Sequence, residues 1–322
     1  MRVLIIGAGV IGTIYGWATS EAGHDVVHVV RPGRASRLAQ GVTLNMFDKR
    51  QGHEKKNVCR YDIKVVESLD PSSDFEIVIV PIHHYELVDT IKQFVPQVKD
   101  ADFLLLTQNW HGTKDVDSIL PQNRYAYGDA KAGGIFRDNG LVATISTIDV
   151  GQVGGRHDNC LRKSIDLLES ADLRPTMHEN ILHYLWVQYA ITGGLWPALV
   201  RAGSFEALLR DRQTGELALT AARECLDVVA RRGVDLSRYP ETRTYYRRSF
   251  VLRQVALMTL KFMFRYSEYA KRSSAHALAD AREIKTFYFD LLNTGRELHV
   301  DMPVLVSFQP DIERFRAQGH PM

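Results

Sequence analysis

The chain has 322 residues, 45% of them hydrophobic and 24% charged, with a formal net charge of +2. This length is enough for two domains with ample cores, and the composition is typical of a soluble globular protein. Because acidic and basic residues nearly balance, the charge argues against nucleic acid as a partner.

The three cysteines, Cys59, Cys160 and Cys225, lie far apart in the sequence. Their spacing forms no metal-binding motif and no even set for disulfides. We therefore expect a reducing, cytoplasmic location and no metal site.

One stretch, residues 181–200, is about as long as a bilayer is thick and carries no formal charge. It contains a histidine, a glutamine, a pair of glycines and a proline, which are poor choices for a lone membrane span. We expect a buried helix that breaks near Gly193 and Gly194, and no membrane partner.

The first thirty residues have the order strand, glycine turn, helix, strand. Residues 2–6 are an apolar run rich in β-branched side chains, and Gly-Ala-Gly-Val-Ile-Gly follows directly at 7–12. An apolar segment at 13–22 leads to a second β-branched run at 26–30. This order is that of the first half of a dinucleotide-binding unit.

Each glycine of this turn has a physical role in that interpretation. Gly7 permits the tight turn, Gly9 lets the backbone approach a pyrophosphate, and Gly12 allows close packing of helix and sheet. The free N–H groups at Val10 and Ile11, at the positive end of the helix dipole, would face the phosphates. The alternative is a glycine turn in an α/β sheet that binds no ligand.

The end of the second strand bears on the choice of cofactor. NAD-binding chains usually carry an acidic residue there, but this chain has Arg31, followed by Arg34 and Arg37, and no acid nearby in sequence. A guanidinium suits a 2′-phosphate through charge-assisted hydrogen bonds. We therefore expect NADPH, and the alternative is a solvated basic turn.

Strands and helices alternate up to about residue 110, which predicts a parallel sheet with binding groups at the C-terminal strand ends. Two such ends, besides the glycine turn, are Pro81 to His84 and Gln108 with Asn109. The polar run 48–56 is expected to be a solvated loop. The predicted strands cover 41–44, 76–81, 102–107, 125–130 and 142–148, and a short helix covers 87–94.

From about residue 179 the strand pattern stops, and helices are expected at 205–232, 243–271 and 274–298. The predicted fold is α/β: a Rossmann-type parallel sheet domain followed by an all-helical C-terminal domain. We place the NADP-binding domain at 1–178 and the helical domain, for substrate binding and dimerisation, at 179–322. The helical domain could support a homodimer.

With these elements in order, the chain resembles the ketopantoate reductase (2-dehydropantoate 2-reductase) family as a divergent member. The resemblance spans almost the whole length and depends on the order and spacing of several motifs. They are the glycine turn at 7–12, Arg31, Gln108-Asn109, Leu185-Trp186, Arg282-Glu283-Ile284, and Gly295 with Val300-Asp301-Met302-Pro303.

The resemblance implies a two-domain NADPH enzyme and a role for several residues. Pro81 and Gln108 would lie at cofactor-binding strand ends, and Arg31 would hold the 2′-phosphate. Asn109 would lie by the nicotinamide ribose and the substrate. Glu283 would hold the substrate or orient its hydroxyl, and Ser274 would face the substrate carboxylate.

The departures from the family concern its proton donor. That donor is a lysine placed four residues before an asparagine, and Gln188 and Thr192 occupy the two positions here. Glutamine cannot transfer a proton. A second family lysine corresponds to His83, so His83 and His84 are the nearest candidates for the acid. Alternatively, one of them packs beneath the cofactor and the other is solvated.

Three functions follow from the sequence. The first is an NADPH-dependent oxidoreductase that reduces a 2-oxo acid or a related small carbonyl or imine. The second is an NADP(H)-binding sensor or regulatory protein with decayed catalytic residues. The third is an opine-type dehydrogenase on the same scaffold, which would accept a bulkier imine.

Overall fold

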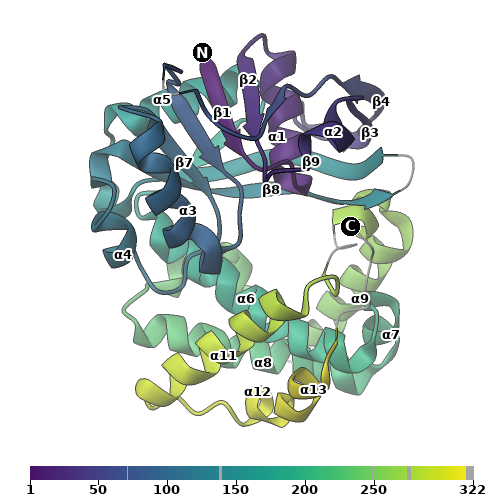
Figure 1. Ribbon diagram of the computed structural model, residues 1–322. Helices are drawn as coiled ribbons and strands as arrows, with labels where there is room; N and C mark the ends of the chain where they lie inside the picture. The colour runs from purple at the N-terminus through teal and green to yellow at the C-terminus, as the bar shows by residue number, and fades with distance from the viewer. Residues whose placement is uncertain (71, 138–139, 248–249, 274–276, 317–322) are drawn as a thin grey trace. The chain divides into compact units, whose positions relative to one another are not determined.

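The computed structural model describes residues 1–70, 72–137, 140–247, 250–273 and 277–316 (Figure 1). The chain divides into two compact units, Met1–Leu182 and His183–Met322. Among the described residues, every helix is too short or too polar to cross a membrane.

Six strands of the first unit form a continuous parallel section of one sheet, in the order β5-β2-β1-β6-β7-β8. Their bounds are β1 Arg2–Ile6, β2 Asp25–Val29, β5 Val65–Val66, β6 Ile77–Val80, β7 Asp102–Leu106 and β8 Tyr125–Arg137. Strands β1, β6 and β7 are buried on both faces, which suits their largely apolar sequences.

The remaining strands make the sheet mixed rather than purely parallel. Strand β9 pairs antiparallel with β8, because the short connection from Arg137 to Gly140 cannot hold a parallel crossover. Strands β3 and β10 pair parallel with β9, and β4 pairs antiparallel with β3. Their bounds are β3 Val42–Asp48, β4 Lys55–Tyr61, β9 Gly140–Gly151 and β10 Pro175–Met177.

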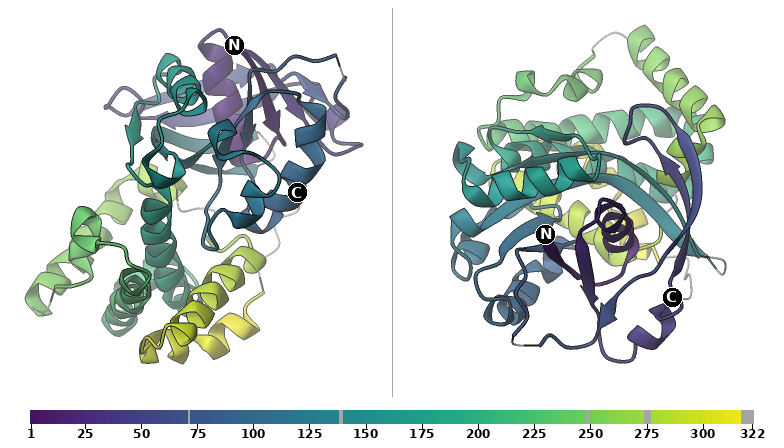
Figure 2. Two further views of the ribbon diagram at one scale, coloured as in Figure 1. Left: turned by 90° about the vertical axis from the view of Figure 1, so that its left-hand side faces the viewer. Right: turned by 90° about the horizontal axis from the view of Figure 1, so that it is seen from above.

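The first unit carries five α-helices among its described residues, of which α1 and α5 pack together against the sheet (Figure 2). Tyr15 and Trp17 of α1 and Leu161 and Leu167 of α5 share one buried apolar cluster with the strands. The helices are α1 Val10–Glu21, α2 Ala35–Leu38, α3 Leu87–Phe94, α4 Lys114–Asp117 and α5 Asn159–Ser170. The short 3-10 helices are Val95–Gln97, Gln122–Arg124, Val153–Gly155 and η1 His84–Glu86.

The polar run between β3 and β4 was expected to be a solvated loop, and for Arg50 this was wrong. Its guanidinium donates to Asp48 at 2.8 Å, to Glu21 of α1 at 2.9 Å and to the carbonyl of Ala171 at 2.9 Å. It also lies 4.7 Å from the ring centroid of Trp17. A buried cation is tolerated because each of its three nitrogens donates to an oxygen. Arg50 therefore holds this hairpin against α1.

Helices α6 to α13 and two short 3-10 helices build the second unit, with α6 beginning in the last residues of the first. The predicted single helix 205–232 is two helices, because the extended backbone of Asp211 ends α7 and its side chain accepts from the amide of Gln213 to start α8. The bounds are α6 Ile181–Ala202, α7 Phe205–Arg210, α8 Arg212–Arg231, α9 Phe250–Tyr266, α10 Glu268–Ser273, α11 Ala281–Glu297, α12 Pro303–Ser307, α13 Gln309–Arg314, η5 Leu236–Arg238 and η6 Pro240–Thr244.

The expected break of α6 near its two glycines does not occur, and the helix runs without interruption. A side chain on Gly193 would overlap Leu291 of α11, and one on Gly194 would overlap the backbone of Ala222 of α8. The glycines therefore serve close helix packing. This contact offsets the roughly 1 kcal/mol that each glycine costs in a helix interior.

Candidate functional site

The turn between β1 and α1 has the geometry that its glycines predicted. Gly7 has φ +88°, in the left-handed region that favours glycine. A Cβ on Gly12 would lie 3.1 Å from the Gly7 carbonyl oxygen and 3.2 Å from Pro81, so this glycine permits close packing. A Cβ on Gly9 would meet no atom within 4 Å. The backbone at Gly9 therefore faces open space.

The first turn of α1 presents backbone amides toward this space. The N-cap residue is Gly9, which has no side chain to cap the helix, and the first helical bond runs from the amide of Thr13 to the Gly9 carbonyl at 2.9 Å. The amides of Val10, Ile11 and Gly12 thus precede the first intrahelical bond. Together with the helix dipole they suit an anion such as a pyrophosphate.

A buried histidine that the sequence analysis did not identify is hydrogen-bonded to this turn. His28 of β2 is fully buried, with Nδ1 2.9 Å from the Gly7 carbonyl oxygen and Nε2 3.0 Å from the Tyr61 hydroxyl. Because a carbonyl only accepts, Nδ1 carries the proton and Nε2 accepts from Tyr61. Burial lowers the pKa of His28 to about 4, so the ring is neutral at neutral pH. Gly16 of α1 leaves the room that this ring needs.

Arg31 lies exposed just beyond β2, where it was expected, but an acid lies in the same turn. Glu67 follows β5, and its Oε1 accepts from the amides of Gly33 at 2.9 Å and Ala35 at 3.0 Å. The amides of Ala35 and Gly33 hold the pKa of this carboxyl below its usual range. Glu67 is distant from Arg31 in the sequence and reaches this turn because β5 pairs with β2.

The residues after β6 lead into the 3-10 helix η1. The imidazole of His83 stacks on the ring of Tyr85, with centroids 5.2 Å apart, and both histidines of the pair are half-buried. The His84 ring lies 6.4 Å from that of His111, which follows β7. The structure therefore brings two imidazoles together at neighbouring strand ends.

Asn109, after β7, closes its own loop. Its Nδ2 donates to the Gly112 carbonyl and to the Tyr127 hydroxyl, each at 2.9 Å, and its Oδ1 accepts from the Gly112 amide at 2.8 Å. Both side-chain N–H groups are thus engaged within the first unit. The remaining capacity for a ligand is one lone pair on Oδ1.

Gln108 begins a chain of polar contacts that sequence reasoning did not find. Its Nε2 donates to Asp129 at 3.0 Å, and Lys131 donates to the other oxygen of Asp129 at 2.5 Å. Lys131 also lies 3.4 Å from Asp149, which accepts from His178 at 2.6 Å. Burial acts to lower the pKa of Lys131, but the two carboxylates outweigh it and raise that pKa. Lys131 therefore stays charged.

The other end of the Gln108 side chain is available to a ligand. A carboxylate only accepts, so the atom that faces Asp129 is the amide nitrogen and the oxygen points away. Oε1 is buried, and within the described part of the chain no group donates to it. A bound molecule with an N–H or O–H group would satisfy this acceptor.

In the helical unit, the two positions that differ from the family lie on one face of α6. Gln188 and Thr192 are four residues apart, which is about one helical turn. The Gln188 amide donates to Glu241 of η6 at 2.9 Å. The position expected to hold a cationic proton donor therefore holds an amide that is paired with a carboxylate.

Of the two predicted substrate residues late in the chain, Ser274 lies outside the described residues. Glu283 is half-buried in the first turn of α11. About two turns further on, Asp290 accepts from the Tyr189 hydroxyl of α6 at 2.6 Å. Burial, then Asp290 and Glu283, raise the pKa of Tyr189. Glu283 therefore lies within electrostatic reach of this pair.

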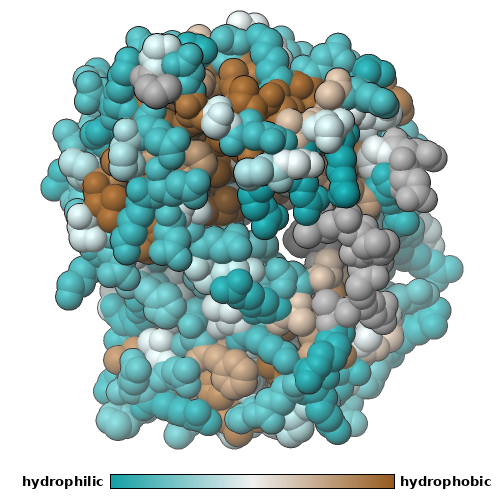
Figure 3. Space-filling model, in the orientation of Figure 1, coloured by the Kyte–Doolittle hydropathy of each residue, from teal (hydrophilic) through white to brown (hydrophobic). Residues whose placement is uncertain are grey.

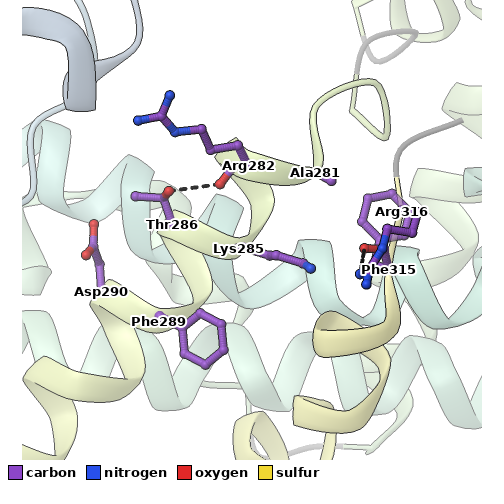
Figure 4. Close-up of a pocket in the computed structure, with 8 residues that line it drawn as sticks. All are labelled: Ala281, Arg282, Lys285, Thr286, Phe289, Asp290, Phe315 and Arg316. Carbon is purple, nitrogen blue, oxygen red and sulfur yellow. Dashed lines mark hydrogen bonds between the residues drawn. The ribbon is translucent and has the colours of Figure 1, made fainter. Parts of the chain in front are cut away.

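A pocket lies along α11 (Figure 4). Its lining is mostly basic and aromatic, and Glu283 is not part of it. On the face that Figure 3 draws, hydrophilic residues predominate in the helical unit. The pocket is lined by Ala281, Arg282, Lys285, Thr286, Phe289, Asp290, Phe315 and Arg316.

Comparison with known proteins tests the resemblance inferred from the motifs. Residues 3–153 match the family model described as ketopantoate reductase PanE/ApbA. That part of the chain is therefore similar to the ketopantoate reductase family. The resemblance inferred from the motifs is therefore confirmed.

Two curated relatives are named 2-dehydropantoate 2-reductase, and both are distant. The protein from Archaeoglobus fulgidus is 26% identical over 247 residues, which cover 75% of this chain and 78% of that protein. The protein from Pyrococcus abyssi is 22% identical over 206 residues, which cover 61% of this chain. The match spans 63% of the Pyrococcus protein, less than two thirds of its length.

Solved structures confirm the predicted fold across the chain. A D-mandelate dehydrogenase solved with NADH and anilino(oxo)acetate has a TM-score of 0.72 at 13% identity, with 97% of each chain covered. The 2-dehydropantoate 2-reductase of Geobacter metallireducens has a TM-score of 0.70 at 14% identity, covering 98% of this chain and 99% of that one. At such identities the likeness concerns the fold.

Proposed function

We propose that this chain is an NADPH-dependent oxidoreductase that reduces a 2-oxo acid or a related small carbonyl or imine. The observation that carries the proposal is the open space at Gly9, bordered by the first-turn amides of α1. The names of the relatives support it, since the curated ones are reductases of a 2-oxo acid and one structural neighbour was solved with NADH.

The residues of the first unit fit such a cofactor. The amides of Val10 and Ile11 would bind the pyrophosphate, and the guanidinium of Arg31 would bind the 2′-phosphate. The buried Oε1 of Gln108 would accept from a donor on the nicotinamide side. When bound, NADPH supplies the hydride for the reaction.

The substrate oxygen also needs a proton, and we propose His84 or His83 as its source. Gln188 cannot release one, and two carboxylates hold Lys131 in its charged form. An imidazole can donate near neutral pH, and a general acid is worth about 10²–10⁴ in rate. Both rings contact Tyr85, His83 by stacking and His84 edge-on, and His84 also lies beside His111, at the next strand end.

The remaining predicted residues would act on the substrate. Asn109 has one acceptor lone pair for the nicotinamide ribose or the substrate, and Thr192 would contribute a hydroxyl beside Gln188. Glu283 would hold the substrate or orient its hydroxyl, and Ser274 would face its carboxylate. Gln188 itself can polarise a carbonyl by hydrogen bonding.

One observation favours a second function, an NADP(H)-binding sensor without turnover. The Gln188 side chain occupies the position of the family's usual proton donor, and its amide is hydrogen-bonded to Glu241. An amide cannot act as a general acid. An opine-type dehydrogenase, acting on an imine of a 2-oxo acid and an amine, is the third possibility left by the sequence.

One assay separates these functions: oxidation of NADPH by the purified chain across a panel of 2-oxo acids, each with and without amines. Steady turnover with a 2-oxo acid alone is the expected result. Turnover that needs an amine would indicate the opine-type reaction, and nucleotide binding without turnover would indicate a sensor. Failure to bind either NADPH or NADH would contradict all three.

We also propose a homodimer formed through α9. Val255, Met258, Phe262 and Tyr266 recur at helical spacing, and between 48% and 68% of each is exposed. Such a stripe is typical of an interface. Light scattering after size exclusion should give twice the mass of 36.5 kDa, and Phe262→Arg should reduce it to the single mass. A monomeric wild-type chain would contradict this proposal.

The expected location is a reducing cytoplasm. The three thiols, at Cys59, Cys160 and Cys225, are all free. Buried thiols without a disulfide partner suit a reducing compartment. Fractionation of the source cells would test the location.

A further inference from the structure

The carboxylate of Glu67 lies where the adenosine end of the proposed cofactor is expected to bind. Strands β2 and β5 run parallel with His28 opposite Val65 and Val29 opposite Val66. Arg31 therefore leaves the end of β2 beside Glu67, which leaves the end of β5. The chain then folds back, with the amide of Arg34 donating to the Arg31 carbonyl at 3.2 Å.

Glu67 occupies the backbone donors of this turn. Its Oε1 accepts from the amides of Gly33 and Ala35 at 2.9 and 3.0 Å, and Gly33, with φ +82°, gives the turn its curvature. Successive amides in such a turn form an anion-binding concavity. Here the anion in the concavity is a side chain of the same protein.

We propose that Glu67 is a specificity-determining residue of the coenzyme site, which weakens the binding of NADPH relative to NADH. The inference builds on the proposed nicotinamide cofactor. Arg31 attracts a 2′-phosphate, whereas Glu67 repels it and withholds the amides that it could otherwise use. The 2′-hydroxyl of NADH carries no charge, and a carboxylate can accept a hydrogen bond from it.

Two substitutions separate the charge from the occupied amides. Glu67→Gln keeps a carbonyl oxygen for the amides of Gly33 and Ala35 but removes the negative charge. Glu67→Ala removes both the charge and the acceptor. The matched control is Glu76→Gln, because Glu76 also accepts from a backbone amide, that of Arg2 at 2.9 Å. It lies at the N-terminal ends of the strands, whereas Glu67 lies at a C-terminal end.

The experiment measures dissociation constants by calorimetry for NADPH and NADH, and for 2′-phospho-ADP-ribose and ADP-ribose, which lack the nicotinamide. Glu67→Gln should tighten the two 2′-phosphorylated ligands by about ten-fold, the scale of one like-charge contact near a protein surface. Glu67→Ala should tighten them at least as much. NADH and ADP-ribose should bind unchanged or more weakly, and thermal melting should show that each variant is folded.

The outcomes separate the inference from the function on which it builds. If the wild-type chain binds NADPH or NADH, but Glu67→Gln changes their affinity ratio no more than Glu76→Gln does, the inference is wrong and the proposed function stands. If the wild-type chain binds neither nucleotide, the proposed function is wrong and the inference falls with it.

Discussion

The Nδ1 atom of His28 lies 2.9 Å from the carbonyl oxygen of Gly7, and this bond ties the second strand to the turn that follows the first. A second bond joins the same two elements, from the Gly7 amide to the Val29 carbonyl at 2.8 Å. The imidazole is neutral because it is buried, and its other nitrogen accepts from Tyr61. The orientation of the turn thus depends on a protonation state.

The first prediction concerns pH. In the folded chain the pKa of His28 is lowered to about 4 from 6.5, so between these values the unfolded chain binds a proton that the folded chain does not. The free energy of unfolding should fall as pH drops from 6.5 to 4, by about 3 kcal/mol in total. Urea unfolding at pH 7 and pH 4.5 measures this loss.

Replacing His28 by Asn keeps a donor for the Gly7 carbonyl but removes the titration. The variant should be less stable at pH 7 and should lose less stability on acidification. The control is His53→Gln, since His53 is exposed. A wild-type chain and a His28→Asn variant with the same dependence on pH would contradict the role assigned to His28.

The second prediction compares two glycines of the same turn. Gly9→Val should abolish nucleotide binding with an unchanged Tm, because the new side chain enters open space and its backbone, at φ −72°, suits any residue. Gly12→Val should lower Tm as well, because its side chain meets the Gly7 carbonyl and Pro81. Normal NADPH affinity in folded Gly9→Val would show that the turn has only a structural role.

The third prediction concerns Arg31. Arg31→Ala should weaken NADPH binding by about 1.5–3 kcal/mol, the scale of a hydrogen bond to a charged group, and should leave NADH binding nearly unchanged. Arg37→Ala, in the exposed part of α2, is the matched control. Calorimetry with both nucleotides tests this, and an equal loss for the two would refute the 2′-phosphate role.

The fourth prediction identifies the acid. His84→Gln should lower kcat by about 10²-fold or more, with His83→Gln as the alternative and His111→Gln as the control for the neighbouring ring. Robust ketopantoate reduction that survives both changes would show that neither histidine is the donor. Gln188→Lys restores the lysine that the family uses as its proton donor. It should raise ketopantoate turnover if Thr192 leaves room for that substrate.

The fifth prediction concerns packing in the helical unit. Alanine is favoured over glycine in a helix by about 1 kcal/mol, but overpacking costs about 1–3 kcal/mol. Gly194→Ala should therefore be destabilising, because Ala222 presents backbone that cannot move aside. Gly193→Ala should cost less, because it meets a side chain, Leu291. Equal Tm values for the two variants would contradict this ranking.

Local patterns were sufficient for the elements whose residues interact with near neighbours in the chain. The apolar run that becomes β6 and the periodic helix α3 have bounds close to those expected. The glycine turn was also predictable, because Gly7, Gly9 and Gly12 act through their own backbone. The order of strands then placed Pro81 and Gln108 at the same sheet edge.

Long-range pairings were not predictable from the same patterns. Arg50 looks like a loop cation until Glu21 and Ala171 are brought beside it. Glu67 follows a strand of only two residues, β5, which has too little periodicity to be recognised. His28 sits in a β-branched run that gives no sign of a polar partner 33 residues later. In each case the partner is supplied by the tertiary fold.

The position of Glu67 has a consequence for how this chain could change over evolutionary time. Both glutamate codons become glutamine codons by a change of their first base alone. The carboxylate of Glu67 binds the turn after β2. If it sets the ratio of the affinities for NADPH and NADH, a single nucleotide substitution can raise that ratio in favour of NADPH without moving the backbone. The chain could then shift from the catabolic toward the biosynthetic coenzyme pool while its fold and its substrate residues stay the same.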